Sequence, residues 1–276
     1  MKKQKLSRAI VYILMFIYAL ICFYPILWMI FYSFKDNEEI FVTNPFGPPI
    51  AIRWENYVRA VSEFNIAIYF KNSVIVSVIS LCLGVFFSLI FTYAVARMPN
   101  RLSKTMRAIV VLGMFIPIQA IMTPLVVMVK NLRLTNTLWS LIVPYVAFSF
   151  PFAVMVLYGF YINLPMDLEE SAYIEGAGFY RTYFQIIFPL MKAPISVLIS
   201  YQFMGHWNEF SLALVLTTKN NLKTLPLGLS SFMGMLSTDW GPIGACLVIA
   251  SLPVMLLYIF FSDKISDAMA YTGIKS

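Results

Sequence analysis

The chain has 276 residues, of which 60% are hydrophobic and only 12% are charged. A soluble domain of this length does not need so much apolar surface, so the composition excludes a soluble domain and indicates an integral membrane protein. The formal net charge is +7, but the Lys and Arg residues gather beside apolar stretches rather than on one folded face, which argues against nucleic-acid binding.

Six apolar stretches are long enough to cross a membrane as helices. A hydrocarbon core of about 30 Å needs roughly 20 helical residues. Five of the stretches hold almost no charged residue, and the fifth in chain order contains Glu209 and the single histidine, His206. The predicted fold class is an all-α membrane protein with six transmembrane helices, and the predicted spans are residues 9–34, 70–97, 107–130, 137–162, 192–216 and 241–262.

Two clusters of cations set the expected orientation. Four precede the first span, and four lie in the short link between the second and third spans. Cytoplasmic ends of membrane helices are enriched in Lys and Arg, so both clusters are expected inside, with both termini cytoplasmic. The clusters are Lys2, Lys3, Lys5 and Arg8, and then Arg97, Arg101, Lys104 and Arg107.

The link between the fourth and fifth spans, residues 164–189, has the opposite charge. It is expected on the cytoplasmic side, yet only Arg181 balances its acidic residues, which are Asp167, Glu169, Glu170 and Glu175. An acidic loop is not expected to lie on anionic lipid. The sequence therefore favours contact with a protein partner, and an ordinary amphipathic connector on the membrane is the alternative.

The local pattern of this link predicts two short helices. Asp167 can cap the first helix, with Glu170 completing a capping-box-like pair, and Gly176 ends it. A helix this short is marginal alone in water, so another surface must hold it. The second helix is expected over residues 179–188, with one side formed by Tyr180, Tyr183, Phe184 and Ile187.

A specific motif runs through the first of these helices. Glu170-Ser-Ala172, two further residues and Glu175-Gly-Ala177, followed by Ile186 and Pro189, resemble the cytoplasmic EAA loop of ABC importer permeases. The similarity extends along the chain and is greatest to the carbohydrate-uptake, maltose-permease-like branch. Further motifs of that branch are Asn56-Tyr57, Asn72-Ser73, Tyr93-Ala-Val-Ala-Arg97, Trp207-Asn-Glu-Phe210, Thr224-Leu-Pro-Leu-Gly228, Trp240-Gly241 and Leu252-Pro253.

The resemblance implies a single permease domain over residues 1–276, with residues 164–189 as a coupling loop. In such permeases this loop carries a coupling helix that sits in a groove of an ATP-binding subunit. The implied partners are two ATP-binding subunits, a second permease subunit in a heterodimer, an extracytoplasmic solute-binding protein and the lipid bilayer of a bacterial cytoplasmic membrane. The implied coupling residues are Glu169, Glu170, Ser171, Ala172, Glu175, Gly176 and Ala177.

No chemical site is evident in the sequence. It holds no Gly-x-x-x-x-Gly-Lys-Ser/Thr phosphate loop, no credible Ser-His-Asp set and no Cys/His cluster with metal spacing. We therefore expect no catalytic residue, no metal and no cofactor on this chain, with ATP and Mg²⁺ held by the partner ATPase. An intramembrane enzyme is disfavoured for the same reason.

Four residues are candidates for a translocation path, namely Gln119, Tyr145, Asn208 and Glu209. Ionisable residues inside spans are often functional, and Pro residues near the first two permit local unwinding beside a cavity. The alternatives are that Glu209 caps a helix break and that the aromatic residues only pack.

The predicted function is import of a sugar or oligosaccharide by alternating access, driven by separate ATPase subunits. Within the importers, a glycerol-phosphate or polyamine solute is the alternative. Outside them, the alternative is an ion-coupled secondary transporter, which would be expected to show paired intramembrane charges or an inverted repeat.

Overall fold

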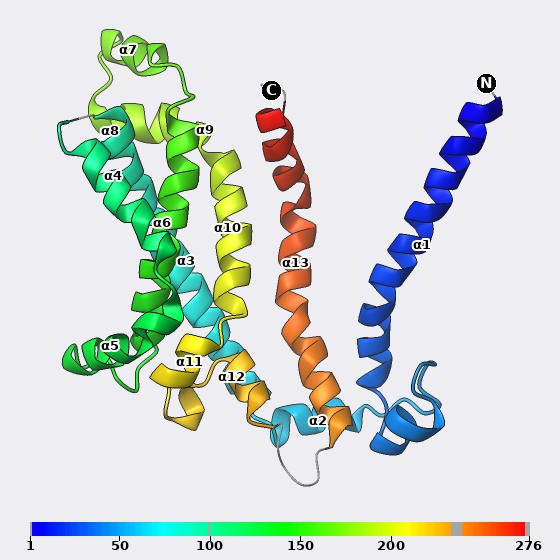
Figure 1. The fold of residues 1–276 in the computed structure, drawn as a ribbon. Helices are drawn as coiled ribbons and strands as arrows, with labels where there is room; N and C mark the ends of the chain where they lie inside the picture. Colours follow the sequence, from blue (N-terminus) through cyan, green and yellow to red (C-terminus); the bar gives the residue numbers. More distant parts are fainter. Residues whose placement is uncertain (1, 99, 233–238, 274–276) are drawn as a thin grey trace. The chain divides into compact units, whose positions relative to one another are not determined.

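The computed structural model describes residues 2–98, 100–232 and 239–273, and all regular structure in those residues is helical (Figure 1). The predicted all-α fold class is confirmed. The α-helices are α1 Lys2–Tyr32, α2 Glu55–Ser62, α3 Ile66–Arg97, α4 Ser103–Leu112, α5 Ile118–Asn131, α6 Trp139–Tyr161, α7 Asp167–Ile174, α8 Phe179–Thr182, α9 Phe188–Leu190, α10 Lys192–Trp207, α11 Ser211–Leu216, α12 Leu225–Ser230 and α13 Trp240–Gly273.

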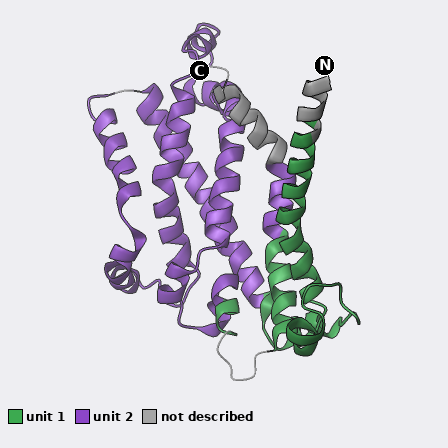
Figure 2. Cartoon of the chain, turned by 45° about the vertical axis from the view of Figure 1, so that its right-hand side comes forward, with its two compact units in different colours: residues 1–67, 228–252 green, residues 68–227, 253–276 purple. Residues whose placement is uncertain are grey.

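Shorter helical turns join these helices. The π-helical turns are η1 Glu39–Thr43 and η3 Tyr183–Ile187, and the 3₁₀ turns are η2 Gly113–Phe115 and η4 Asn220–Leu222. The chain divides into two compact units, coloured separately in Figure 2. Unit 1 comprises residues 1–67 and 228–252, and unit 2 comprises residues 68–227 and 253–276. The single permease domain over residues 1–276 stays a prediction.

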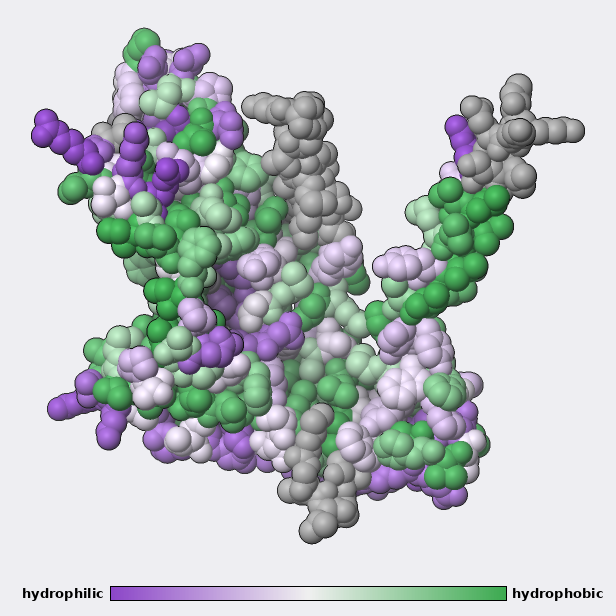
Figure 3. All heavy atoms as spheres, in the orientation of Figure 1, coloured by the Kyte–Doolittle hydropathy of each residue, from purple (hydrophilic) through white to green (hydrophobic). Residues whose placement is uncertain are grey.

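Within the described residues, four helices are long and apolar enough to cross a membrane, and two bent helix pairs raise the number to six if each pair is one span. The continuous ones are 10–32, 66–97, 139–161 and 240–261. The exposed surface of α1 is apolar along most of its length, as expected for a helix facing lipid or another subunit (Figure 3).

The first bent pair has a local cause in the sequence. Its two parts, 103–115 and 118–131, meet at 105°. Ile116 is extended, and Pro117 after it has no N–H to continue the ladder of helical hydrogen bonds. The structure thus interrupts the predicted span 107–130.

The second bent pair joins 179–190 to 192–207 at 66°. The bend lies at Met191, whose ψ of 2° departs from helical geometry. The helix then stops at Trp207 and resumes as α11 at Ser211, so the predicted span 192–216 also contains a break.

Unit 1 is organised around buried polar contacts at the end of α1. The Lys35 ammonium donates to the carbonyls of Asn44 and Gly47 at 2.5 and 2.7 Å, which orders the following loop. The Asn56 amide donates to the carbonyls of Ser33 and Lys35, both at 2.9 Å. A Cβ on Gly241 would lie 2.4 Å from the Lys35 carbonyl oxygen, so that position requires glycine.

Unit 2 is built on α3, α6 and α10, with one apolar cluster near each end. The cluster beside residues 164–189 has α3, α6, η3 and α10 as its walls. At the other end, the Asn72 amide donates to the carbonyls of Asn221 and Lys223, both at 2.9 Å. The Ser73 hydroxyl accepts the Leu225 N–H at 2.8 Å. These contacts explain the Asn72-Ser73 motif as the support of a loop.

Candidate functional site

Helix α7, which the sequence predicts as the coupling helix, follows the end of α6 in the chain and stands beyond it in the fold (Figure 1). It begins at Asp167, and its N-cap residue is Met166, which makes no side-chain cap. The predicted Asp167 cap with Glu170 is therefore wrong by one residue, because Asp167 already lies in the helix. Three carboxylates still occupy the first turn, where they suit the partial positive charge of the helix N-terminus.

The helix ends in a Schellman motif centred on Gly176, which has a φ of +79°. Its N–H donates to the Tyr173 carbonyl at 3.0 Å, and the Ala177 N–H donates to the Ala172 carbonyl at 2.9 Å. Only glycine adopts this backbone conformation without strain. The predicted helix stop at Gly176 is confirmed.

A substitution pair isolates the role of this φ angle. Gly178 lies two residues further on at φ −74°, which any residue adopts, and a Cβ on either glycine meets open space. We expect Gly176→Val to destabilise the α7 turn by at least about 1 kcal/mol and to lower uptake, whereas Gly178→Val stays close to wild type. Equal uptake by the two variants, at equal membrane insertion, would contradict a role for the turn.

The residues predicted to contact an ATPase lie on two different faces of α7. Glu169 and Ala172 are buried against their own chain. Glu170, Ser171, Glu175 and Gly176 are exposed, and Ala177 is half-buried. Beside the exposed residues lies Ile174, which is 87% exposed, an unusual position for a large aliphatic side chain. We call the exposed set of Glu170, Ser171, Tyr173, Ile174 and Glu175 the outer face of α7.

The buried face of α7 is held by Arg97 at the end of α3. The Arg97 Nε lies 3.4 Å from a Glu169 carboxylate oxygen, and the two side chains are 3% and 8% exposed. A second nitrogen of the same guanidinium donates to the Leu164 carbonyl at 2.7 Å, at the start of the loop. One side chain thus ties α3, a candidate membrane span, to both the start of the loop and α7.

Burial raises the pKa of the Glu169 carboxyl above its ordinary value, and the Arg97 charge offsets only part of this. A raised pKa in the folded state contributes stability that is present at low pH and is lost as pH rises through that pKa. We therefore expect hydrogen-exchange protection of α7, corrected for intrinsic rates, to fall as pH increases, and we expect this fall to be lost in Glu169→Gln. Protection that rises with pH in the wild type would contradict this.

Aromatic rings of α3, α6 and η3 pack together beneath the loop of residues 164–189. The Tyr93 ring packs edge-on against Tyr183 and Tyr161, with centroids 4.7 and 5.7 Å apart. Ile187 is fully buried in the same cluster. Tyr93 lies on α3, Tyr161 ends α6, and Tyr183 begins η3, so the loop packs directly against both spans.

The predicted side for the second helix is only half right. Tyr183 and Ile187 are buried, whereas Tyr180 and Phe184 are 75% and 59% exposed. Residues 183–187 form a π-helical turn, whose wider spacing rotates the side chains away from an α-helical register.

Two of the four predicted path residues lie together. The Tyr145 hydroxyl of α6 donates to the Glu209 carboxylate at 2.8 Å. The same carboxylate accepts the N–H groups of Leu212 and Ala213 at 2.7 and 3.1 Å, which caps α11. The His206 ring stacks on Tyr145 with centroids 5.4 Å apart. The helix-capping alternative for Glu209 thus describes a contact in the structure.

The other two path residues are placed differently. Asn208 is exposed, and its amide donates to the Met204 carbonyl one turn back. Gln119 is exposed on the first turn of α5. Within the described residues, no hydrogen bond joins Gln119 to Tyr145, Asn208 or Glu209.

Substituting Glu209 by Gln separates capping from transport. Because the amide keeps only one acceptor oxygen, we expect a stability loss of about 1 kcal/mol from the weakened cap. A path role predicts that uptake per folded molecule also falls. Unchanged uptake per folded molecule would remove Glu209 from the path and leave it as a cap.

Comparison with known proteins decides the family. Residues 84–271 match the family described as "Binding-protein-dependent transport system inner membrane component". The chain belongs to this family. It is a transmembrane permease of the ABC importer class.

Relatives cover nearly the whole permease. It is 33% identical over 264 residues to the diacetylchitobiose uptake system permease protein NgcG of Streptomyces coelicolor, covering 95% of this chain and 87% of that protein. It is 30% identical to the trehalose/maltose transport system permease protein MalG of Thermococcus litoralis, covering 100% and 99%. A solved bacterial ABC transporter that imports the polysaccharide alginate shares the fold, with a TM-score of 0.83 at 18% identity over 95% of this chain and 98% of that one.

Proposed function

We propose that this permease imports a sugar or oligosaccharide by alternating access and that ATP hydrolysis on separate subunits drives it. The observation that carries the proposal is the geometry of α7. Its inner face is tied to a membrane span by Arg97 and Glu169, and its outer face presents Ile174 among acidic side chains. A helix bound to a membrane span on one side and exposed on the other can pass a displacement from a partner protein to that span.

In this mechanism the ATPase subunits bind the outer face of α7 and draw it inward as they close on ATP. The displacement passes through the Arg97–Glu169 pair to α3, and through Tyr183 and Ile187 to α6 and α10. ATP and Mg²⁺ belong to the partner, and this chain supplies no group to the hydrolysis.

The proposed substrate class is supported by the relatives, whose names refer to diacetylchitobiose and to trehalose and maltose. A glycerol phosphate or a polyamine is the less favoured solute. We propose that Tyr145, Asn208 and Glu209, with Gln119, contribute to the path, and that the Tyr145–Glu209 contact marks its position on α6 and α11.

The proposed assembly contains a second permease subunit, two ATPase subunits and an extracytoplasmic solute-binding protein. Both termini and residues 164–189 are cytoplasmic in this proposal. Its support is the Lys and Arg residues near the first span and in the α3–α4 link.

Uptake by proteoliposomes tests the proposal. The purified permease, with its partner subunits and binding protein, is given labelled neutral oligosaccharides, glycerol phosphate and a polyamine in parallel. We expect oligosaccharide uptake that requires ATP and the ATPase subunits and survives an uncoupler. Uptake that continues without the ATPase and stops with an uncoupler would establish the ion-coupled alternative instead.

A further inference from the structure

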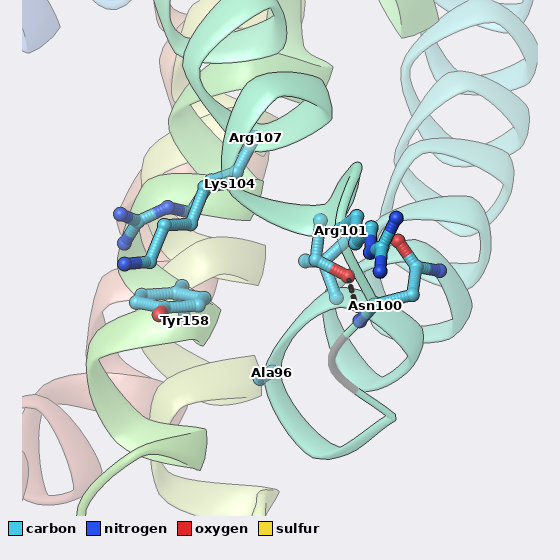
Figure 4. Close-up of a pocket in the computed structure, with 8 residues that line it drawn as sticks. Ala96, Asn100, Arg101, Lys104, Arg107 and Tyr158 are labelled. Carbon is cyan, nitrogen blue, oxygen red and sulfur yellow. Dashed lines mark hydrogen bonds between the residues drawn. The ribbon is translucent and has the colours of Figure 1, made fainter.

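A cationic pocket lies between the α3–α4 turn and α6, and its lining includes none of the predicted coupling or path residues. Its volume is about 350 Å³, and the polar residues that line it are Asn100, Arg101, Ser103, Lys104, Arg107 and Tyr158. Figure 4 shows Lys104 and Arg107 reaching toward the Tyr158 ring, with Arg101 and Asn100 on the turn. No carboxylate is among the residues that line this pocket.

Hydrogen bonds within residues 100–103 and a cation–π contact shape the walls of the pocket. The Asn100 N–H donates to the Ser103 hydroxyl at 3.0 Å, and the Leu102 N–H donates to the Asn100 side-chain oxygen at 2.8 Å, so residues 100–103 are joined by local hydrogen bonds. The Arg107 guanidinium lies 3.9 Å from the centre of the Tyr158 ring, a cation–π contact that leaves its N–H edges available. Among the described residues, no salt bridge involves Arg101, Lys104 or Arg107.

An apolar groove adjoins the cationic pocket and shares two of its residues. This second cavity, of about 230 Å³, is lined by Arg107, Ala108, Val111, Met155 and Tyr158. It runs along α4 and α6 from the charged end toward the middle of the candidate spans. Nearby on α4, Ile109 and Leu112 are 64% and 61% exposed, as expected for a surface bathed in lipid. A free phosphate ion has no apolar part to bury in this groove, whereas a phospholipid can bury its acyl chain there.

We propose that this paired cavity binds an anionic phospholipid. Lys104 and Arg107, which end together beside Tyr158, hold the headgroup phosphate, and Arg101 on the turn adds positive charge to the same pocket (Figure 4). The acyl chain lies against Ala108, Val111 and Met155. Clusters of cations at the membrane surface attract anionic lipids, and basic pockets between spans bind their headgroups. The bound lipid joins α4 to α6 beside Arg97. This site is separate from sugar transport, and the test below requires neither uptake nor ATP hydrolysis.

Lipid retention measured by native mass spectrometry tests the site. The complex as purified is exchanged into micelles containing phosphatidylglycerol and phosphatidylcholine, and bound lipids are counted. We expect selective retention of phosphatidylglycerol, reduced roughly 10- to 30-fold in Lys104→Gln/Arg107→Gln, because each cation near an anionic lipid surface contributes about a fivefold preference. The matched control, Lys130→Gln/Arg133→Gln, removes two exposed cations elsewhere on the chain and should retain lipid as the wild type does.

Competition measurements distinguish a lipid from free phosphate, and a third variant keeps the test valid if the double variant misfolds. Short-chain phosphatidylglycerol is expected to bind more weakly than the long-chain lipid, and millimolar inorganic phosphate should not displace the long-chain lipid. Arg101→Gln, on the turn outside α4, should lower retention about fivefold even if the double variant misfolds. Equal retention by wild type and Arg101→Gln, or displacement by inorganic phosphate, would overturn the proposal.

Discussion

Replacing Arg97 by Met is expected to release α7 from the membrane helices and to remove coupled uptake. The substitution leaves the Glu169 carboxylate buried without its charge partner, which costs about 3–5 kcal/mol in comparable buried pairs. The least costly response is for α7 to detach from α3, because it is a helix of only 8 residues within the loop of residues 164–189. We expect the docked state to fall by roughly 100-fold or more.

A double-substitution cycle isolates the ion pair from other effects of the change. Glu169→Leu alone leaves Arg97 unpaired, whereas Arg97→Met/Glu169→Leu replaces the whole pair by apolar groups. We expect the double variant to recover uptake and protection of α7 relative to Arg97→Met. Additive losses in the double variant would mean that Arg97 acts through Leu164 or the turn after α3, and not through Glu169.

Replacing Ile174 by Asp is expected to abolish association with the ATPase while leaving the permease folded. Ile174 is 87% exposed in this chain, so the change disturbs no internal packing. If a partner covers the side chain, its burial is worth about 1.5–3 kcal/mol, and a buried carboxylate is unfavourable in its place. We expect association to weaken by roughly 10- to 100-fold, measured by co-purification of the ATPase subunits.

Val42→Asp is the matched control for this change. Val42 is also a β-branched residue and is 73% exposed, but it lies on η1 in unit 1. Its substitution should leave ATPase association unchanged. Equal association of the ATPase with Ile174→Asp and Val42→Asp would contradict docking on the outer face of α7.

Much of this account could be predicted from the sequence because it depends on local chemistry. Apolar stretches of membrane length predict spans wherever they occur, and Gly176 predicts a helix end because few other residues adopt its φ. The break at Pro117 depends on the same kind of local signal, although one uninterrupted span was predicted there.

The division of α7 into two faces could not be predicted in this way. Glu169 and Glu170 are adjacent acids in one loop, and their residue type does not show which of them is buried. The difference arises because Arg97, more than 70 positions earlier in the chain, lies beneath one of them. The acidity of the loop and the cation at the end of α3 are both evident in the sequence, and the pairing of the two is the signal that could have identified Glu169 as the buried acid.

The prediction of the buried side of the second helix in the loop was half wrong for a different reason. An α-helical spacing groups Tyr180 with Tyr183, Phe184 and Ile187, but the π-helical turn breaks that spacing. Packing against Tyr93 and Tyr161 sets which rings are buried, and this depends on spans far away in the sequence. The capping role of Glu209 was predicted in part. A cap at a helix break was one alternative, but the contact with Tyr145 was not predicted.

The most direct test of the central claim is the reactivity of a cysteine placed at Ile174. The background replaces Cys22, Cys82 and Cys246 by Ser, because the first two are exposed in this chain. Ile174→Cys should react readily with a maleimide in the permease alone and become strongly protected when the ATPase subunits bind, while Val42→Cys reacts equally in both. Labelling at position 174 that is unchanged by the ATPase would show that the outer face of α7 is not where an energy-supplying subunit binds.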